Sequence, residues 1–242
     1  MATYDFIRMA HGLIGILALS AFWTAGFTRK GSPLHKASGK IYLLTMAGIL
    51  LTACPLVLSM LLNGQQIAAM FFAYLIVITT TGVWNSWRAI KDKRDWARYT
   101  GPIYKFLMGL NGVSGLAVIY AGLSLAKQNA GIFIAFSLVG ILSALKMWRF
   151  KRKPPNDARW WLKEHFGAMI GNGVATHIAF LSIGLPKLLP MLSGPLLQNI
   201  AWLGPLGLSI VAGFYLNRKY MPVKISSVEN RNEVIKTPEI MP

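Results

Sequence analysis

Acidic residues and cysteine are scarce in this sequence. Eight Asp and Glu residues stand against 25 Lys and Arg residues in a chain of 242, and Cys54 is the single cysteine. One cysteine excludes an intramolecular disulfide and any metal site built on several thiolates. The sequence also has no Gly-x-Ser-x-Gly elbow, His-Glu-x-x-His motif, phosphate-binding loop or pair of intramembrane aspartates. No catalytic group can therefore be named, and it stays open whether the protein is an enzyme.

The apolar segments lack two further features. The last one, "NIAWLGPLGLSIVAGFYLN", contains no lysine, which excludes a retinal Schiff base of the rhodopsin kind. Apart from Glu164 at one end, the predicted helices hold no acidic residue, whereas cation-coupled transporters commonly use carboxylates within the membrane. A transporter of that class is therefore disfavoured.

Long apolar runs dominate what remains. Hydrophobic residues make up 54% of the chain and the mean hydropathy is +0.47. Runs of about 20 apolar residues have the length that a helix needs to cross the hydrocarbon of a bilayer. The pattern predicts an all-α fold, an integral membrane bundle of seven transmembrane helices, at residues 8–28, 41–62, 67–87, 104–126, 130–149, 165–185 and 196–216.

The basic residues alternate along the chain. They gather after the first, third, fifth and seventh predicted helices, while the other gaps are almost free of charge. By the positive-inside rule, the amino terminus lies outside the cell and the carboxyl terminus in the cytoplasm. The net charge of +17 thus needs no nucleic-acid partner, and we expect none. Residues 1–220 form the membrane domain, and the polar segment 221–242 is predicted to be a disordered cytoplasmic tail.

Four histidines fall at two depths of the predicted bundle. His11 and His177 lie toward the outer leaflet, and His35 and His165 lie toward the cytoplasmic surface. Neutral imidazole is a common ligand of iron, copper and zinc, so one pair near each leaflet would suit two haems or two metal sites. Buried histidines that bind a neighbouring helix, a substrate or lipid phosphate explain the same pattern without a metal.

A polar stripe runs along the helix predicted at 165–185. His165, Asn172 and Thr176 share one face, because they are seven and eleven residues apart, whereas His165 and His177 lie about 120° apart around the helix. We expect Asn172 and Thr176, together with Glu164, to line an internal cavity or passage. Glu164 begins this helix, where a carboxylate suits the helix dipole or orients the neighbouring imidazole.

Three segments carry a resemblance to a known group of proteins. They are "KGSPLHKASGKIYLLTM" from Lys30 to Met46, "WLKEHFGAMIGNGVATHIAF" and "WLGPLGLSIVAGFYLNRKY". With His11 before them, they resemble an uncharacterised family of bacterial multi-pass membrane proteins that carry a domain of unknown function. The resemblance implies a bacterial inner-membrane protein in which His11, His35 and His165 are the shared positions.

Two classes of function follow as expectations. The first is a redox membrane protein that binds haem b or a transition metal through His11, His177, His35 and His165. The alternative is a non-catalytic carrier or accessory subunit, whose histidines and Asn172 line a passage or hold helices together. The lipid bilayer is the expected partner in both, and a homo-oligomer or a membrane partner subunit stays open. A membrane enzyme acting on lipid or quinone is a third class, for which the sequence identifies no catalytic residue.

Overall fold

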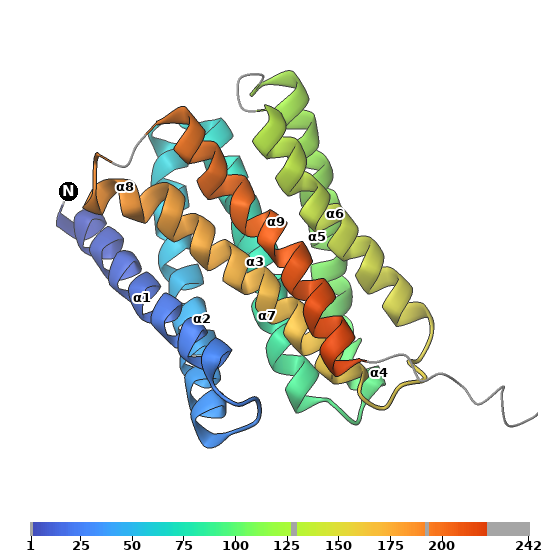
Figure 1. Cartoon of the computed structure of the whole chain (residues 1–242). Helices are drawn as coiled ribbons and strands as arrows, with labels where there is room; N and C mark the ends of the chain where they lie inside the picture. The colour runs from blue at the N-terminus through green and yellow to red at the C-terminus, as the bar shows by residue number, and fades with distance from the viewer. Residues whose placement is uncertain (1, 127–129, 192–193, 222–242) are drawn as a thin grey trace, which may run out of the picture.

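The computed structural model describes residues 2–126, 130–191 and 194–221, and all regular secondary structure in these ranges is helical. Seven of its helices are long and apolar enough to cross a membrane, which confirms the predicted number and the all-α fold (Figure 1). They are α1 (Ala2–Phe27), α2 (Pro33–Leu62), α3 (Gln66–Lys91), α5 (Pro102–Ser124), α6 (Ala130–Arg152), α7 (Trp160–Ala179) with its continuation η2 (Phe180–Gly184), and α9 (Pro195–Tyr220). The short helices α4 (Trp96–Tyr99) and α8 (Leu185–Leu188) complete the described part.

Three helices begin well before their predicted first residue. Helix α1 was predicted from residue 8 and begins at Ala2. Helix α2 was predicted from residue 41 but begins at Pro33, because the Ser32 side chain accepts a hydrogen bond from the backbone N–H of His35 and Pro33 occupies the first turn. Helix α7 was predicted from residue 165 but begins at Trp160. The added turns contain charged residues, Lys36 and Lys40 in α2 and Lys163 and Glu164 in α7, so hydropathy alone places them in loops. His35 and Glu164 consequently lie inside helices.

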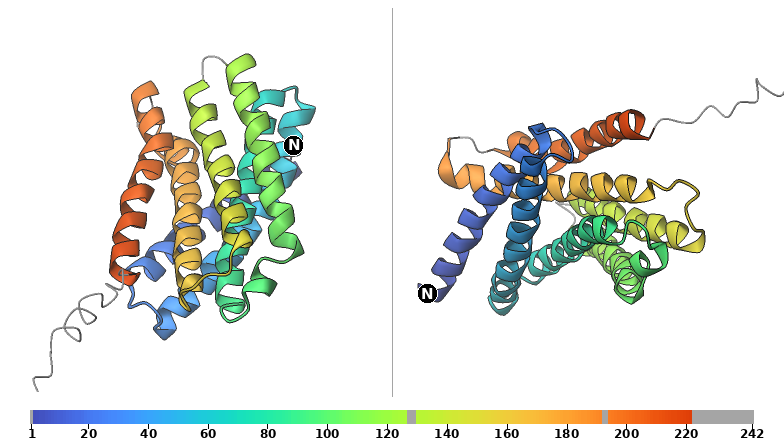
Figure 2. Two further views of the ribbon diagram at one scale, coloured as in Figure 1. Left: turned by 90° about the vertical axis from the view of Figure 1, so that its right-hand side faces the viewer. Right: turned by 90° about the horizontal axis from the view of Figure 1, so that it is seen from below.

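Helices α3 and α7 form the centre of the bundle. Helix α3 packs against α2, α5 and α7, while α7 also packs against α1 and α9. Two hairpins, α1 with α2 and α5 with α6, flank this central pair (Figures 1 and 2). Side chains of α3 and α7 that face each other are therefore shielded from lipid on most sides, and the buried polar groups of the bundle include Asn172 and Thr176 of α7.

One close contact between helices is made where a glycine meets a polar side chain. The Tyr74 hydroxyl of α3 donates to the carbonyl of Phe136 (2.6 Å) and accepts from the N–H of Gly140 (2.9 Å), both in α6. A Cβ at Gly140 would collide with this hydroxyl. Tyr74 also belongs to an aromatic core with Phe71, Phe133 and Trp202. Glycine thus permits a hydrogen bond between helices inside the bundle.

The loops 28–32, 92–95 and 153–159 and the carboxyl end of α9 lie at one end of the bundle, which we name the basic end (Figure 2). Pro55 and Pro205 do not end their helices, since α2 and α9 continue through them. The opposite end of α7 passes into a π-helical turn just before Pro186. The tail predicted to be disordered falls almost wholly outside the described residues.

Candidate functional site

A band of polar side chains crosses the interface of α2, α3 and α7. We name it the polar seam, and its members are His35 and Tyr42 from α2, Ser86 from α3, and His165, Asn172 and Thr176 from α7. All but the two histidines are buried, and the histidines are half-buried. The seam begins at the basic end with the histidines, and the eleven residues from His165 to Thr176 correspond to about 16 Å of helix.

His35 and His165 present the same arrangement of ring nitrogens. His35 Nδ1 lies 3.0 Å from the carbonyl oxygen of Ala25 in α1, and His165 Nδ1 lies 3.0 Å from the carbonyl oxygen of Ser86 in α3. A carbonyl oxygen only accepts hydrogen bonds, so Nδ1 carries the hydrogen in both rings. Each Nε2 therefore keeps its lone pair.

The carbonyl contact of His35 also has a structural role. Ala25 O accepts a second hydrogen bond from Lys30 Nζ at 2.9 Å, and the same ammonium donates to Gly26 O. These are among the last carbonyls of α1, which have no partner within their own helix. His35 and Lys30 thus cap α1 together. Partial burial and the positive charge of Lys219 lower the pKa of Lys30.

Asn172 is the most isolated polar group of the polar seam. Its side chain is 1% exposed, and neither the amide nitrogen nor the amide oxygen has a hydrogen-bond partner among the described residues. It lies against Gly82 of α3, where a Cβ would collide with its Oδ1. Four hydrogen-bonding positions of one amide are thus left unused in the interior, although burying such a group unpaired is costly.

Thr176 connects α7 to α2. Its hydroxyl oxygen lies 2.9 Å from the carbonyl oxygen of Asn172 and 3.0 Å from the hydroxyl oxygen of Tyr42. With the Thr176 hydrogen donated to the carbonyl, Tyr42 donates to Thr176. The sequence analysis missed Tyr42, although it follows His35 by seven residues and so lies on the same face of α2. That spacing was the available signal.

The structure does not bring His11 and His177 together. His11 Nδ1 lies 2.8 Å from the Thr52 hydroxyl of α2. The His177 ring packs edge-on against Phe22 and Trp23, with ring centroids 5.4 Å apart in both pairs, and its Nδ1 donates to Gly173 O. Phe22 and Trp23 follow His11 by about 17 Å along α1. The two histidines, expected at a similar depth, therefore face different neighbours.

Glu164 is an ion-pair partner at the basic end. Its carboxylate is buried and lies 2.9 Å from Lys146 Nζ of α6, whose side chain is 54% exposed. Tyr99 of α4 lies nearby, and burial together with the negative charge of Glu164 raises its pKa. Glu164 is the fifth residue of α7, so it joins α7 to α6 rather than capping the first turn. The sequence analysis did not predict that Lys146 is the ion-pair partner of Glu164.

The donor set constrains what could bind at the polar seam. Within the described residues, no group of three or more His, Cys, Asp or Glu side chains could hold a metal ion. A bare zinc ion takes four protein ligands in structural sites and three in catalytic ones. Haem iron needs two axial ligands at most, since the macrocycle supplies the other four. Of the groups considered, haem best matches the donor count of His35 and His165.

No family model matches the chain, and no curated protein or solved structure matches it either. The resemblance to bacterial multi-pass proteins with a domain of unknown function therefore stays a prediction. The functional conclusion depends on the geometry of the seam.

Proposed function

We propose that this protein is a redox membrane protein in which His35 and His165 ligate the iron of haem b near the basic end. The observation that carries the proposal is the matched pair of imidazoles. They come from two different helices at the same end of the bundle, and each keeps an Nε2 lone pair. Metal-bound histidines generally donate their other ring N–H to a carbonyl or carboxylate, as both do.

The chain's own groups would fix the orientation of both ligands. Ala25 O holds the His35 ring, and Ser86 O holds the His165 ring, so neither imidazole can rotate without losing a hydrogen bond. Each carbonyl also raises the basicity of the ring nitrogen that faces the metal. A bound haem would supply one-electron chemistry to such a site. The outer pair of the sequence analysis, His11 with His177, is not part of the proposal.

The setting proposed for this function is a bacterial inner membrane. The basic end faces the cytoplasm, which leaves the amino terminus outside and the carboxyl terminus inside. Support comes from the alternation of basic and uncharged loops and from the resemblance described above.

An absorption spectrum of the detergent-purified protein, oxidised and then reduced with dithionite, tests the proposal. The protein should be expressed with haem and metals supplied, and its metal content measured on the same sample. We expect a Soret band and, on reduction, separate α and β bands, both lost in His35→Ala and His165→Ala. Added imidazole should restore part of the signal in these variants, because it can replace a missing axial ligand.

His11→Ala is the matched control. It removes a histidine that is hydrogen-bonded to one hydroxyl, outside the polar seam, so haem binding should persist. A colourless wild-type protein without stoichiometric metal would overturn the redox proposal. Equal loss of the signal in His11→Ala and His165→Ala would also do so, since the loss would then reflect folding.

The buried amide of Asn172 favours a second candidate, a non-catalytic carrier or accessory subunit. A passage needs polar groups without partners inside the bundle, and this amide has all its hydrogen-bonding positions unused. Under this alternative the purified protein carries no chromophore. Substrate flux in vesicles, or a membrane partner recovered in constant ratio, then depends on Asn172 and persists in His165→Ala.

A further inference from the structure

A surface pocket of about 340 Å³ lies at the basic end, in the loop between α3 and α4. Its lining is formed by Lys91, Asp92, Lys93, Arg94, Asp95 and Arg98. Four basic and two acidic side chains give it a net charge of +2. The pocket is separate from the polar seam.

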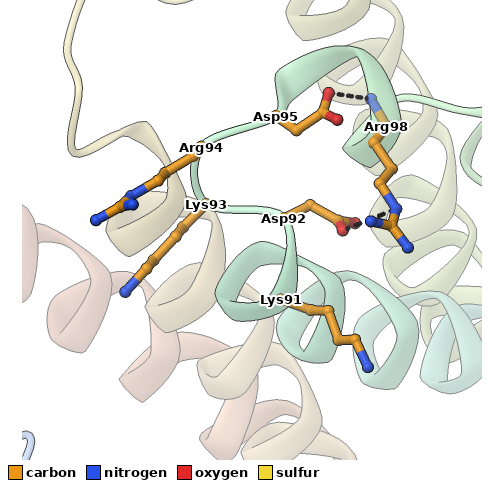
Figure 3. Close-up of a pocket in the computed structure, with 6 residues that line it drawn as sticks. All are labelled: Lys91, Asp92, Lys93, Arg94, Asp95 and Arg98. Carbon is orange, nitrogen blue, oxygen red and sulfur yellow. Dashed lines mark hydrogen bonds and ion pairs between the residues drawn. The ribbon is translucent and has the colours of Figure 1, made fainter.

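Both carboxylates of the pocket are already engaged. Asp92 is 3% exposed and forms ion pairs with Arg88 and with Arg98 Nε. Asp95 accepts a hydrogen bond of 2.8 Å from the backbone N–H of Arg98. In Figure 3 both acids turn toward Arg98 and away from Lys93 and Arg94. The negative charge of the loop is therefore used internally.

Lys93 and Arg94 are left with uncompensated charge. Their side chains are exposed, and in Figure 3 both extend to the same side of the loop. Neither is among the ion pairs that the described residues form. Two adjacent cations without an acidic partner repel each other, and an anion bound between them relieves that repulsion.

Tryptophan rings place the pocket at the level of lipid headgroups. Lys93 Nζ lies 5.8 Å from the ring centroid of Trp161, and Lys91 Nζ lies 5.6 Å from that of Trp87. Tryptophan is enriched where a membrane meets water, because its ring is apolar and its N–H is polar. The cations of the pocket thus sit at the depth of phosphate groups rather than out in solution.

We infer that this pocket binds the phosphate headgroup of an anionic phospholipid. A net charge of +2 favours a lipid with net negative charge over a zwitterionic one, whose amine would meet Lys93 and Arg94 unfavourably. The inference is independent of haem binding at His35 and His165 and stands or falls separately.

Native mass spectrometry of the protein in a non-ionic detergent tests the inference, by titration with dioleoyl phosphatidylglycerol. We expect the double variant Lys93→Ala/Arg94→Ala to bind this lipid about 25-fold more weakly, since each basic residue near an anionic surface contributes roughly a factor of five. The matched control is Arg218→Ala/Lys219→Ala. These two exposed cations also lie over aromatic rings at the basic end, but outside the pocket. The control should change the affinity less than about two-fold.

Three results would overturn the inference. Equal weakening in both double variants would mean that only the overall charge of the basic end matters. Equally tight binding of dioleoyl phosphatidylethanolamine would remove the requirement for an anionic lipid. Displacement of the lipid by inorganic phosphate at similar concentration would make the pocket a site for a soluble anion. Both double variants should unfold at the wild-type temperature, because none of the four side chains is buried.

Discussion

At the scale of single residues, the contact between Asn172 and Gly82 decides how closely α3 and α7 approach. The buried amide occupies the space that a Cβ at Gly82 would take. The sequence spacing alone predicted that Asn172 and Thr176 share a face with His165, because helical periodicity is local. Which residue they meet on another helix could not be predicted, since spacing contains no information about lateral neighbours. Gly82 therefore became visible only in the fold, as did the hydrogen bond between Tyr42 and Thr176.

Gly82→Ala should destabilise the protein by about 1 to 3 kcal/mol, because the new methyl group displaces a side chain in a packed interface. Thermal unfolding in detergent measures this. Gly109→Ala is the control, since a Cβ there meets no other group within 4 Å, and alanine favours the helix. In an Asn172→Ala background the cost of Gly82→Ala should shrink, because the colliding amide is gone. Equal costs in both backgrounds would contradict the assigned contact.

At the scale of helices, the apolar cores were predictable and the polar ends were not. All seven spans follow from runs of about 20 apolar residues. Beyond the hydrocarbon, however, a helix continues without apolar residues, and its end is set by capping groups. Ser32 and Pro33 give such a signal for α2. Helix α7, in contrast, begins at Trp160 without a side-chain cap. The second boundary left no pattern to find.

The ion pair of Lys146 with Glu164 joins α6 to α7 and has an asymmetric cost. Lys146→Ala leaves the buried Glu164 carboxylate without its counter-ion, and we expect a loss of about 1 to 3 kcal/mol, below the range for fully buried pairs because Lys146 is half-exposed. Glu164→Gln removes the buried charge as well and should cost less. Thermal unfolding of both variants at neutral pH measures which of the two loses more stability. A larger loss for Glu164→Gln would show that hydrogen bonding, and not charge, dominates there.

At the scale of the whole molecule, the depth of each segment in the membrane was predictable, and the arrangement of the helices in the membrane plane was not. Hydropathy shows which residues lie within the membrane, and the alternation of basic loops shows which loops lie on the same side of it. The number of spans and the common side of the basic loops therefore follow from the sequence. The arrangement within the membrane plane depends on side-chain packing between helices that are distant in the chain. Pairing His11 with His177 by depth assumed equal levels, whereas the His177 ring meets α1 near Phe22 and Trp23.

The orientation of the bundle is testable through the charge asymmetry that predicts it. Lys and Arg residues near span ends resist translocation, so the basic end should remain in the cytoplasm.

Alkaline phosphatase fused to a membrane protein is active only outside the cytoplasm, and green fluorescent protein fluoresces only inside it. A phosphatase inserted between α2 and α3, at Gly64, should therefore be active, whereas a fluorescent protein fused after residue 242 should fluoresce. A fusion truncated after Lys153 should also fluoresce, because five spans precede it and an odd number of crossings carries a chain that begins outside into the cytoplasm. Since α6 ends at Arg152 as the fifth span, fluorescence there and phosphatase activity at Gly64 are jointly possible in one orientation alone. The reversed pattern would place the basic end outside and move the proposed haem and lipid sites to the opposite face of the membrane.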